Sequence, residues 1–162
     1  MLKLGSLAMN GSALPDRALK VHECWGELIV SGLKDWEIRS SHTNVRGRIG
    51  IMATGKSERQ LLGEATLCDC FELTREDDGT GRPHIDDHYF NHRLPDMSAD
   101  AVIASYERVF AWRLVEPVKY NPPVTIKNRQ GCVTWIMINR PAKPRERNQK
   151  AGERNRPARK VL

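Results

Sequence analysis

Lys34, Glu37 and Arg39 are the side chains whose types and spacing point most directly to chemistry. Two cations flank one carboxylate within six residues, and nearby positive charge favours the ionised form of a carboxylate. If residues 36–39 are extended, Glu37 and Arg39 point to the same face of a strand. Such a carboxylate predicts a fixed acceptor for the exocyclic amine or ring N–H of a base, with Arg39 or Lys34 holding a phosphate.

Two other interpretations of these charges stay open. An ordinary ion pair at the protein surface would contribute only ~0–1 kcal/mol and would need no ligand. A general base would have to take up a proton near neutral pH, and the cations beside Glu37 work against that. The spacing therefore favours recognition over catalysis.

An aromatic partner for such a pocket is expected among the tryptophans at positions 25, 36, 112 and 135. Large aromatic side chains usually serve the core, but one beside a charged cleft can stack on an unpaired base. Trp25 and Trp36 flank the charged residues, so they are the candidates for the cleft. Trp112 and Trp135 are expected in the core.

His84, His88 and His92 recur at four-residue intervals. On a helix they would share one face and, with Asp86 or Asp87, would form a weak candidate for a divalent metal site. Glycine and proline on both sides favour a different interpretation, in which residues 72–97 form a solvated insertion or cap the cleft. No cofactor is expected.

The elements that must position these residues follow from hydrophobic periodicity. Apolar residues at 25, 28 and 29 have helical spacing, and Gly32 stands where a helix end needs left-handed backbone geometry. Ser98 is expected to cap another helix at residues 99–108. Predicted strands cover residues 18–21, 36–39, 48–53, 63–71, 110–115 and 131–138. Six short strands with two or three short helices predict an α+β fold, a small β-barrel.

Prolines are expected to interrupt this sheet after residue 115. Pro117, Pro122 and Pro123 cannot donate to a ladder. The sequence therefore predicts an irregular extended connection between the last two strands.

Charge divides the chain into a lead (1–17), a domain (18–138) and a basic tail (139–162). The tail holds nine Lys or Arg and two Glu, a charge of +7, whereas the remaining 138 residues hold 17 basic and 18 acidic side chains, a charge of −1. With so few apolar residues the tail is expected to be disordered. It is either a solvated extension or an arm that binds phosphates regardless of sequence.

The four cysteines match no zinc-binding spacing, and free thiols are expected at positions 24, 68, 70 and 132. No apolar run approaches the roughly 20 residues that a membrane span needs. The first 16 residues lack the apolar centre of a signal peptide. A cytoplasmic protein is expected.

Gly32, Lys34, Glu37 and Arg39 form the pattern G-x-K-x-x-E-x-R, which resembles the hallmark of the ASCH (activating signal cointegrator homology) domain. The likeness runs from Ala18 to about Ile138 through further segments in the family's order. These are an aromatic-led helix at 24–29, an R-G-R strand at 46–51, G-E-A at 63–65, F-A-W at 110–112 and a proline loop at 122–124.

The resemblance implies a PUA-like β-barrel whose cleft is lined by the hallmark residues, in a superfamily that commonly binds RNA or modified bases. We count Arg46, from the R-G-R segment, with the candidate ligand-binding residues. The expected partner is nucleic acid, single-stranded RNA or a modified nucleotide, recognised in the cleft through one base or nucleotide.

An enzyme is the alternative that the resemblance offers. Small amidohydrolases of the family that act on N4-acetylcytidine have G-x-K-x-x-T-x-R, with a catalytic Lys and Thr and a Glu from the later insertion. This chain keeps Lys34 but has Glu37 in place of the Thr, and Asp86, Asp87 and Asp96 offer no clear third carboxylate. A nucleoside hydrolase or a ribonuclease would depend on Lys34. A regulatory adaptor that binds a metabolite or a protein segment is a third class.

Overall fold

A computed structural model describes residues 13–54, 60–74, 79–94, 104–126 and 133–138 of the 162-residue chain. The tail 139–162, Asp96, Cys132 and the first half of the predicted helix at 99–108 lie outside the described residues. The strands are β1 (Arg17–His22), β2 (Trp36–Arg39), β3 (Gly47–Thr54), β4 (Gln60–Leu73), β5 (Val109–Thr125) and β6 (Trp135–Met137). The helices are α1 (Glu23–Val30), a 3₁₀ turn η1 (Asp86–His88) and α2 (Tyr89–His92).

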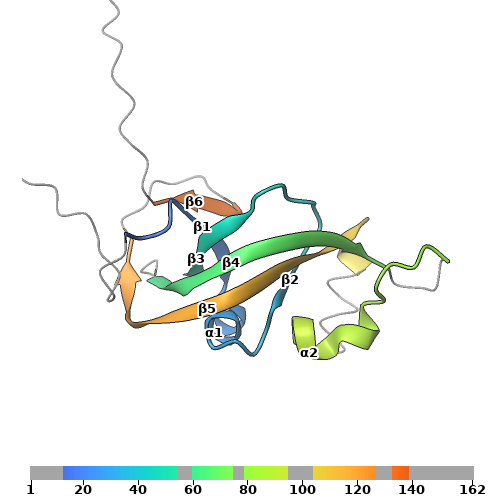
Figure 1. Cartoon of the computed structure of the whole chain (residues 1–162), viewed down its shortest axis with the longest axis horizontal. Coiled ribbons are helices and arrows are strands. Elements are labelled where there is room, and N and C mark those ends of the chain that lie inside the picture. The colour runs from blue at the N-terminus through green and yellow to red at the C-terminus, as the bar shows by residue number, and fades with distance from the viewer. Residues whose placement is uncertain (1–12, 55–59, 75–78, 95–103, 127–132, 139–162) are drawn as a thin grey trace, which may run out of the picture.

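The six strands form one curled half-barrel sheet in the order β2-β5-β4-β3-β1-β6 (Figure 1). Strands β1 and β3 run parallel, and the other neighbours run antiparallel. A parallel pair needs a crossover connection, and here the crossover contains α1 and β2. This confirms the predicted α+β fold with six strands and short helices.

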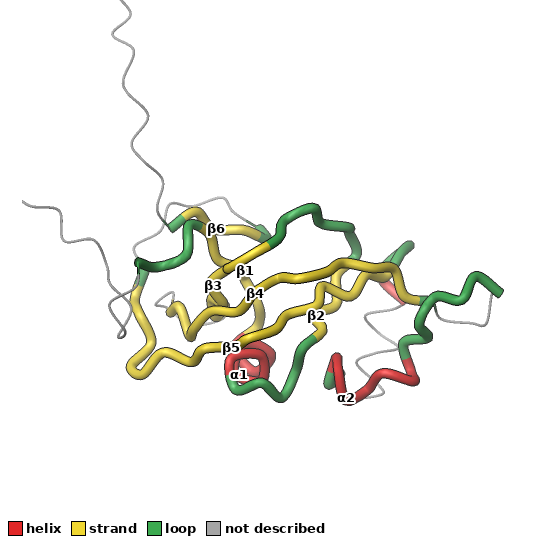
Figure 2. The backbone as a smooth tube through the Cα atoms, in the orientation of Figure 1, coloured by secondary structure: helices red, strands yellow, loops and turns green. Residues whose placement is uncertain are grey.

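Helix α1 covers the concave part of the sheet, where it contacts β3, β4 and β5 (Figure 2). Gly26 faces the sheet, and a Cβ there would lie 2.8 Å from Leu62 and 3.0 Å from Val21. Glycine therefore lets the helix backbone approach the strands. Ile29, one of the three apolar residues with helical spacing, is buried in the same core together with Val30, whereas Trp25 and Leu28 are partly buried.

Strand β5 is longer than the sequence predicts, because it continues past the prolines, but its ladder with β4 is irregular there, as expected. Its ladder with β4 extends from Val109 to Thr125. The register shifts twice in the proline-containing part, once between Val115 and Val118 and once between Lys119 and Val124. The prolines lie in these two bulges, where a residue needs no ladder hydrogen bond.

Helix α2, which belongs to the 72–97 insertion, packs against β2 and the turn before it. Asn91 Nδ2 donates to the Asp35 carboxylate at 3.0 Å, and the Asp35 N–H donates to the Asn91 carbonyl at 3.1 Å. Helix α2 ends at Arg93, which has left-handed geometry (φ 54°). Within the described residues, neither helix is long and apolar enough to cross a membrane.

Candidate ligand-binding site

The turn after α1 directs Lys34 into the protein. Gly32 has φ 75°, and the N–H groups of Leu33 and Lys34 both donate to the Leu28 carbonyl, at 2.9 and 3.1 Å. The left-handed residue closes the helix end, as predicted for Gly32. The Lys34 side chain is consequently only 1% exposed.

All three N–H groups of the Lys34 ammonium have a neighbouring acceptor. Nζ lies 2.5 Å from the carbonyl oxygen of Trp36, 2.6 Å from that of His92 and 3.6 Å from Glu37 Oε2. Burial lowers the pKa of Lys34, and the Glu37 carboxylate opposes that shift. Lys34 therefore links β2, α2 and Glu37, and its buried ammonium is poorly placed to bind a phosphate.

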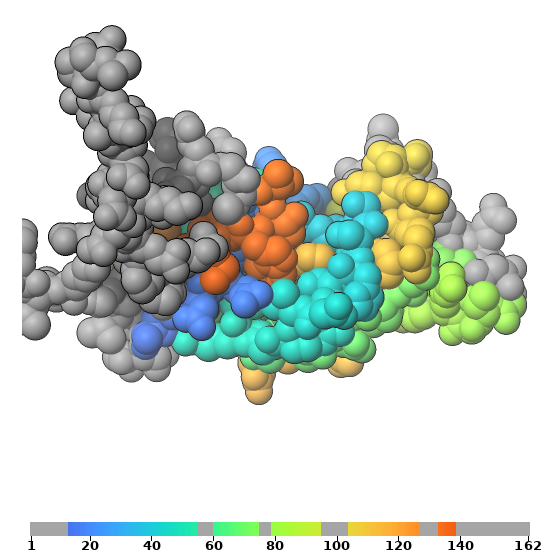
Figure 3. All heavy atoms as spheres, turned by 90° about the horizontal axis from the view of Figure 1, so that it is seen from above, coloured from blue at the N-terminus to red at the C-terminus, as the bar shows by residue number. Residues whose placement is uncertain are grey.

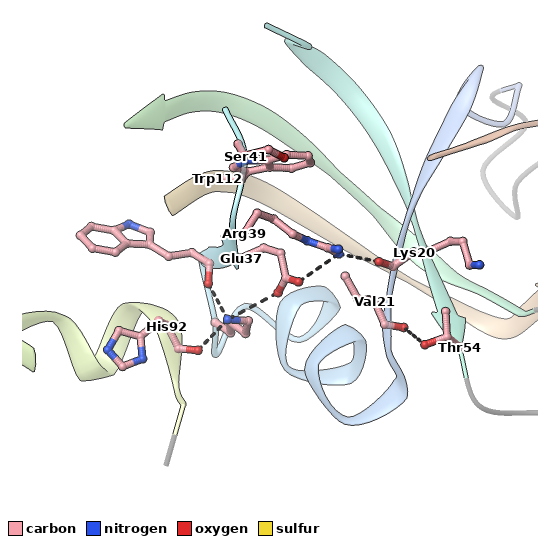
Figure 4. Close-up of polar contacts among 10 residues, drawn as sticks. Lys20, Val21, Glu37, Arg39, Ser41, Thr54, His92 and Trp112 are labelled. Carbon is pink, nitrogen blue, oxygen red and sulfur yellow. Dashed lines mark hydrogen bonds and ion pairs between the residues drawn. The ribbon is translucent and has the colours of Figure 1, made fainter. Parts of the chain in front are cut away.

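Glu37 and Arg39 lie on one face of β2, as the alternation of an extended strand predicts. Arg39 Nη2 lies 3.1 Å from Glu37 Oε1 and donates at 2.5 Å to the carbonyl of Lys20 on β1. Figure 4 shows both side chains pointing from β2 toward β1, with His92 on the other side of Glu37. Glu37 is thus fixed between an ammonium and a guanidinium.

Arg39 keeps a donor without a partner. Its Nε is buried and has no hydrogen-bond acceptor among the described residues, although such a group costs about 1–3 kcal/mol when it stays unsatisfied. The guanidinium also lies over Trp112, with Cζ 5.8 Å from the ring centroid. Of the two cations that the sequence offers for a ligand phosphate or carbonyl, Arg39 is the more accessible, since its side chain is 22% exposed and that of Lys34 is 1% exposed.

These side chains line a cavity of about 450 Å³, a typical size for a small-ligand site. Strand β1, helix α1, β2 and the segments after α2 all contribute to its walls. Trp25 is half-buried at the cavity and its ring centroid lies 5.7 Å from Lys34 Nζ. The lining residues are Lys20, Val21, His22, Trp25, Lys34, Glu37, Ile38, Arg39, Thr54, Leu94, Tyr106 and Val133.

Two sequence candidates do not line this cavity. The Trp36 ring is buried behind it, against Phe71 (centroids 5.0 Å apart) and His88 (4.5 Å), because it points to the opposite face of β2 from Glu37. Arg46 lies at a separate hollow with Asp16 and Arg17, where its Nη1 donates to the Thr43 carbonyl at 2.9 Å. Neither side chain is positioned to contact a ligand in the Lys34–Glu37–Arg39 cavity.

The three histidines face different partners. His84 Nδ1 lies 3.8 Å from Asp86, and His88 packs on Trp36. His92 is buried, with Nε2 3.0 Å from the Ile85 carbonyl and Nδ1 accepting the Leu94 N–H at 3.0 Å. Burial lowers the pKa of His92. No group of three or more metal-binding side chains comes together within the part of the chain that the structure describes.

Several cavity residues carry no signal in the sequence. Leu94 and Tyr106 come from either side of a stretch outside the described residues. Seen from above, residues 40–46 (cyan) and 104–110 (yellow) lie side by side (Figure 3), and the rings of His42 and Phe110 are 5.8 Å apart. These contacts join segments that are far apart in the sequence, so they depend on tertiary structure.

Comparison with known proteins identifies the fold. The crystal structure of ASCH from Zymomonas mobilis matches with a TM-score of 0.51 and 21% identity, over 64% of this chain and 68% of that one. A tyrosine-to-phenylalanine mutant of the Zymomonas mobilis protein matches with a TM-score of 0.57 and 19% identity, over 76% and 89% of the two chains. A serine-to-alanine mutant of the same protein matches with a TM-score of 0.54 and 19% identity, over 78% of this chain and 92% of that one.

At the sequence level, a family model for the ASCH domain matches residues 19–124. No curated protein sequence gives a significant match. The matched range contains all four hallmark positions, Gly32, Lys34, Glu37 and Arg39. The chain therefore belongs to the ASCH domain family, which is generally thought to bind RNA.

Proposed function

We propose that this protein binds nucleic acid, single-stranded RNA in particular, and takes one unpaired base or nucleotide into the Lys34–Glu37–Arg39 cavity. One observation carries the proposal. The Glu37 carboxylate is fixed between two cations at the wall of a cavity of about 450 Å³, and its side chain stays 10% exposed. A buried, oriented acceptor of this kind suits the amino or imino edge of a base.

The neighbouring side chains support distinct roles. Lys34 positions Glu37, because its buried ammonium donates to two backbone carbonyls and pairs with the carboxylate. The Arg39 side chain is 22% exposed at the cavity, so its guanidinium is suited to a carbonyl or phosphate oxygen. Trp25 offers a half-exposed ring on which a base can stack.

Glu37→Gln tests the proposal, because it keeps the shape of the side chain and converts one acceptor oxygen into a donor. Affinities of the wild type and the variant are compared across single-stranded RNA of different base compositions. Loss of one base contact should reduce affinity for the preferred base by about five- to 150-fold. The salt dependence should stay unchanged, since Glu37 contacts no phosphate.

Glu27→Gln is the matched control, because Glu27 is an exposed carboxylate on α1 paired with Lys119 and lies outside the cavity. It should bind RNA like the wild type. An unchanged base preference in Glu37→Gln, or a wild type that binds no RNA at low salt, would contradict the proposal.

A hydrolase is a second candidate, and one observation favours it. Burial lowers the pKa of Lys34, and a lysine with a lowered pKa is suited to proton transfer. The wild type and Lys34→Ala are incubated with N4-acetylcytidine and with single-stranded RNA. Product that requires Lys34 would support this candidate, whereas equal signals from both proteins would exclude it.

A further inference from the structure

An exposed aromatic patch lies on α2 and on the turn after α1. Phe90 is 76% exposed, Leu33 54% and Tyr89 43%, and the rings of Tyr89 and Phe90 are 5.8 Å apart. Arg93 joins them, because its Nε donates to the Leu33 carbonyl at 2.8 Å. We refer to Leu33, Tyr89, Phe90 and Arg93 as the Phe90 patch.

A cation at the centre of this patch indicates which kind of ligand the patch can bind. The Arg93 guanidinium lies over both rings, with Cζ 5.0 Å from the Phe90 centroid and 6.0 Å from that of Tyr89. A guanidinium beside an exposed ring complements a nucleotide, whose base stacks on the aromatic face while its phosphate pairs with the cation. A purely apolar partner would leave that charge unpaired.

The Phe90 patch is next to the cavity wall along the chain. Arg93 stands between His92, whose carbonyl accepts a hydrogen bond from Lys34, and Leu94, which lines the cavity. Consecutive Cα atoms are about 3.8 Å apart, so the backbone of Arg93 lies one residue from the cavity wall. The hydrogen bonds between Asn91 and Asp35 hold α2 in this position.

We infer that the Phe90 patch is a second nucleotide site, on which the base adjacent to the one in the cavity stacks on Phe90 while its phosphate pairs with Arg93. This inference rests on the proposed function and adds a second subsite to it. A single nucleotide would occupy the cavity alone. A longer single strand would occupy both sites, so the patch contributes only to binding of the longer ligand.

Ligand length provides the test. Binding of the four ribonucleoside monophosphates and of short single-stranded RNAs is measured for the wild type, Phe90→Ala, Phe90→Trp and Arg93→Ala. Phe90→Ala should reduce RNA affinity by about five- to 150-fold and leave monophosphate affinity unchanged, while Phe90→Trp keeps the ring and the affinity. Arg93→Ala should lower the slope of log affinity against log salt by about one contact.

Val118→Ala and Arg113→Ala are matched controls, because both side chains are exposed on β5 outside the patch. They should bind RNA like the wild type, and thermal unfolding verifies that every variant is folded. RNA binding by the wild type that is equal in Phe90→Ala and Arg93→Ala overturns the second site and leaves the cavity proposal standing. Self-association that Phe90→Ala abolishes without changing RNA binding also overturns it, in favour of a protein partner. A wild type that binds no RNA overturns both.

Discussion

At the scale of residues, Lys34 explains how a charged cluster remains stable while largely buried. An isolated buried ammonium is strongly unfavourable, and a buried pair is tolerated only when further hydrogen bonds satisfy both partners. Lys34 has two carbonyl acceptors and a carboxylate, and Glu37 has a second cation in Arg39. The cluster is therefore a structural unit as well as a candidate ligand site.

Lys34→Met should destabilise the protein by about 3–5 kcal/mol, because it leaves a buried carboxylate and two carbonyl groups without their shared donor. The free energy of unfolding is obtained by urea denaturation. Lys119→Met is the matched control: its ammonium pairs with Glu27 at the surface, so the change should stay below about 1 kcal/mol. If Lys34→Met lowers the free energy of unfolding no more than a control change of below about 1 kcal/mol, Lys34 has no structural role of this kind.

The residue pattern predicts part of this site and misses part. Alternation along β2 is sufficient to place Glu37 and Arg39 on one face. The burial of Lys34 was not predictable, because one of its acceptors is the carbonyl of His92, 58 residues later in the chain. Trp36 supplies the other carbonyl, whereas its ring belongs to the core.

At the scale of elements, α2 forms one side of the site and depends on a neutral histidine. The Leu94 N–H donates to His92 Nδ1, so that nitrogen must be unprotonated. The Lys34 ammonium adds to the effect of burial in lowering the His92 pKa. Protonation of His92 would break the contact and place a second cation beside Lys34.

The free energy of unfolding should therefore fall as the pH drops through 6.5, the ordinary pKa of histidine. In that range the unfolded chain takes up a proton that the folded chain excludes, until the lowered folded pKa is reached. Urea denaturation between about pH 5 and 8 should show a weaker pH dependence in His92→Gln than in the wild type. His42→Gln, at an exposed histidine, is the control and should resemble the wild type. Equal pH dependence in His92→Gln and the wild type would refute this account.

Strand β4 needs a glycine at position 63, where it pairs closely with β5. A Cβ on Gly63 would overlap the carbonyl oxygen of Val118 and lie 2.9 Å from Val30. Gly63→Ala should lower the free energy of unfolding by about 1–3 kcal/mol or more, because the backbone of β5 has to move. In Gly50→Ala the nearest atom is the flexible end of Leu61, at 2.6 Å, so the cost should be smaller. Urea denaturation compares the two, and a Gly63→Ala protein as stable as Gly50→Ala would contradict this packing.

Periodicity predicts the existence and type of these elements better than their lengths. Strand β2 and helix α1 follow from short local patterns. Strand β5 does not, because two bulges let it continue past Pro117 and Pro122, and bulges depend on the partner strand rather than on local sequence.

At the scale of the whole molecule, the positive net charge is concentrated in the tail, and the rest of the chain is nearly neutral. Residues 139–162 carry +7 and the rest of the chain carries −1. If the tail contacts phosphates, removing 139–162 should weaken RNA binding and flatten its salt dependence, which has a slope of about −0.7 per phosphate contact for single strands. Replacing its nine basic residues with Gln keeps the length and should have the same effect. An unchanged slope in both variants would assign the tail no part in binding.

The pairing of β1 with both β3 and β6 also determines the order in which the sheet can form. β1 pairs with β6 through Arg17 and Met137, so its outer edge stays open until nearly all of the domain has been synthesised. An unpaired edge is a template for another strand, and contacts between distant residues slow folding. A nascent chain that ends at β5 therefore exposes β1, and β6 covers that edge, so that the sheet then ends in a strand of only three residues.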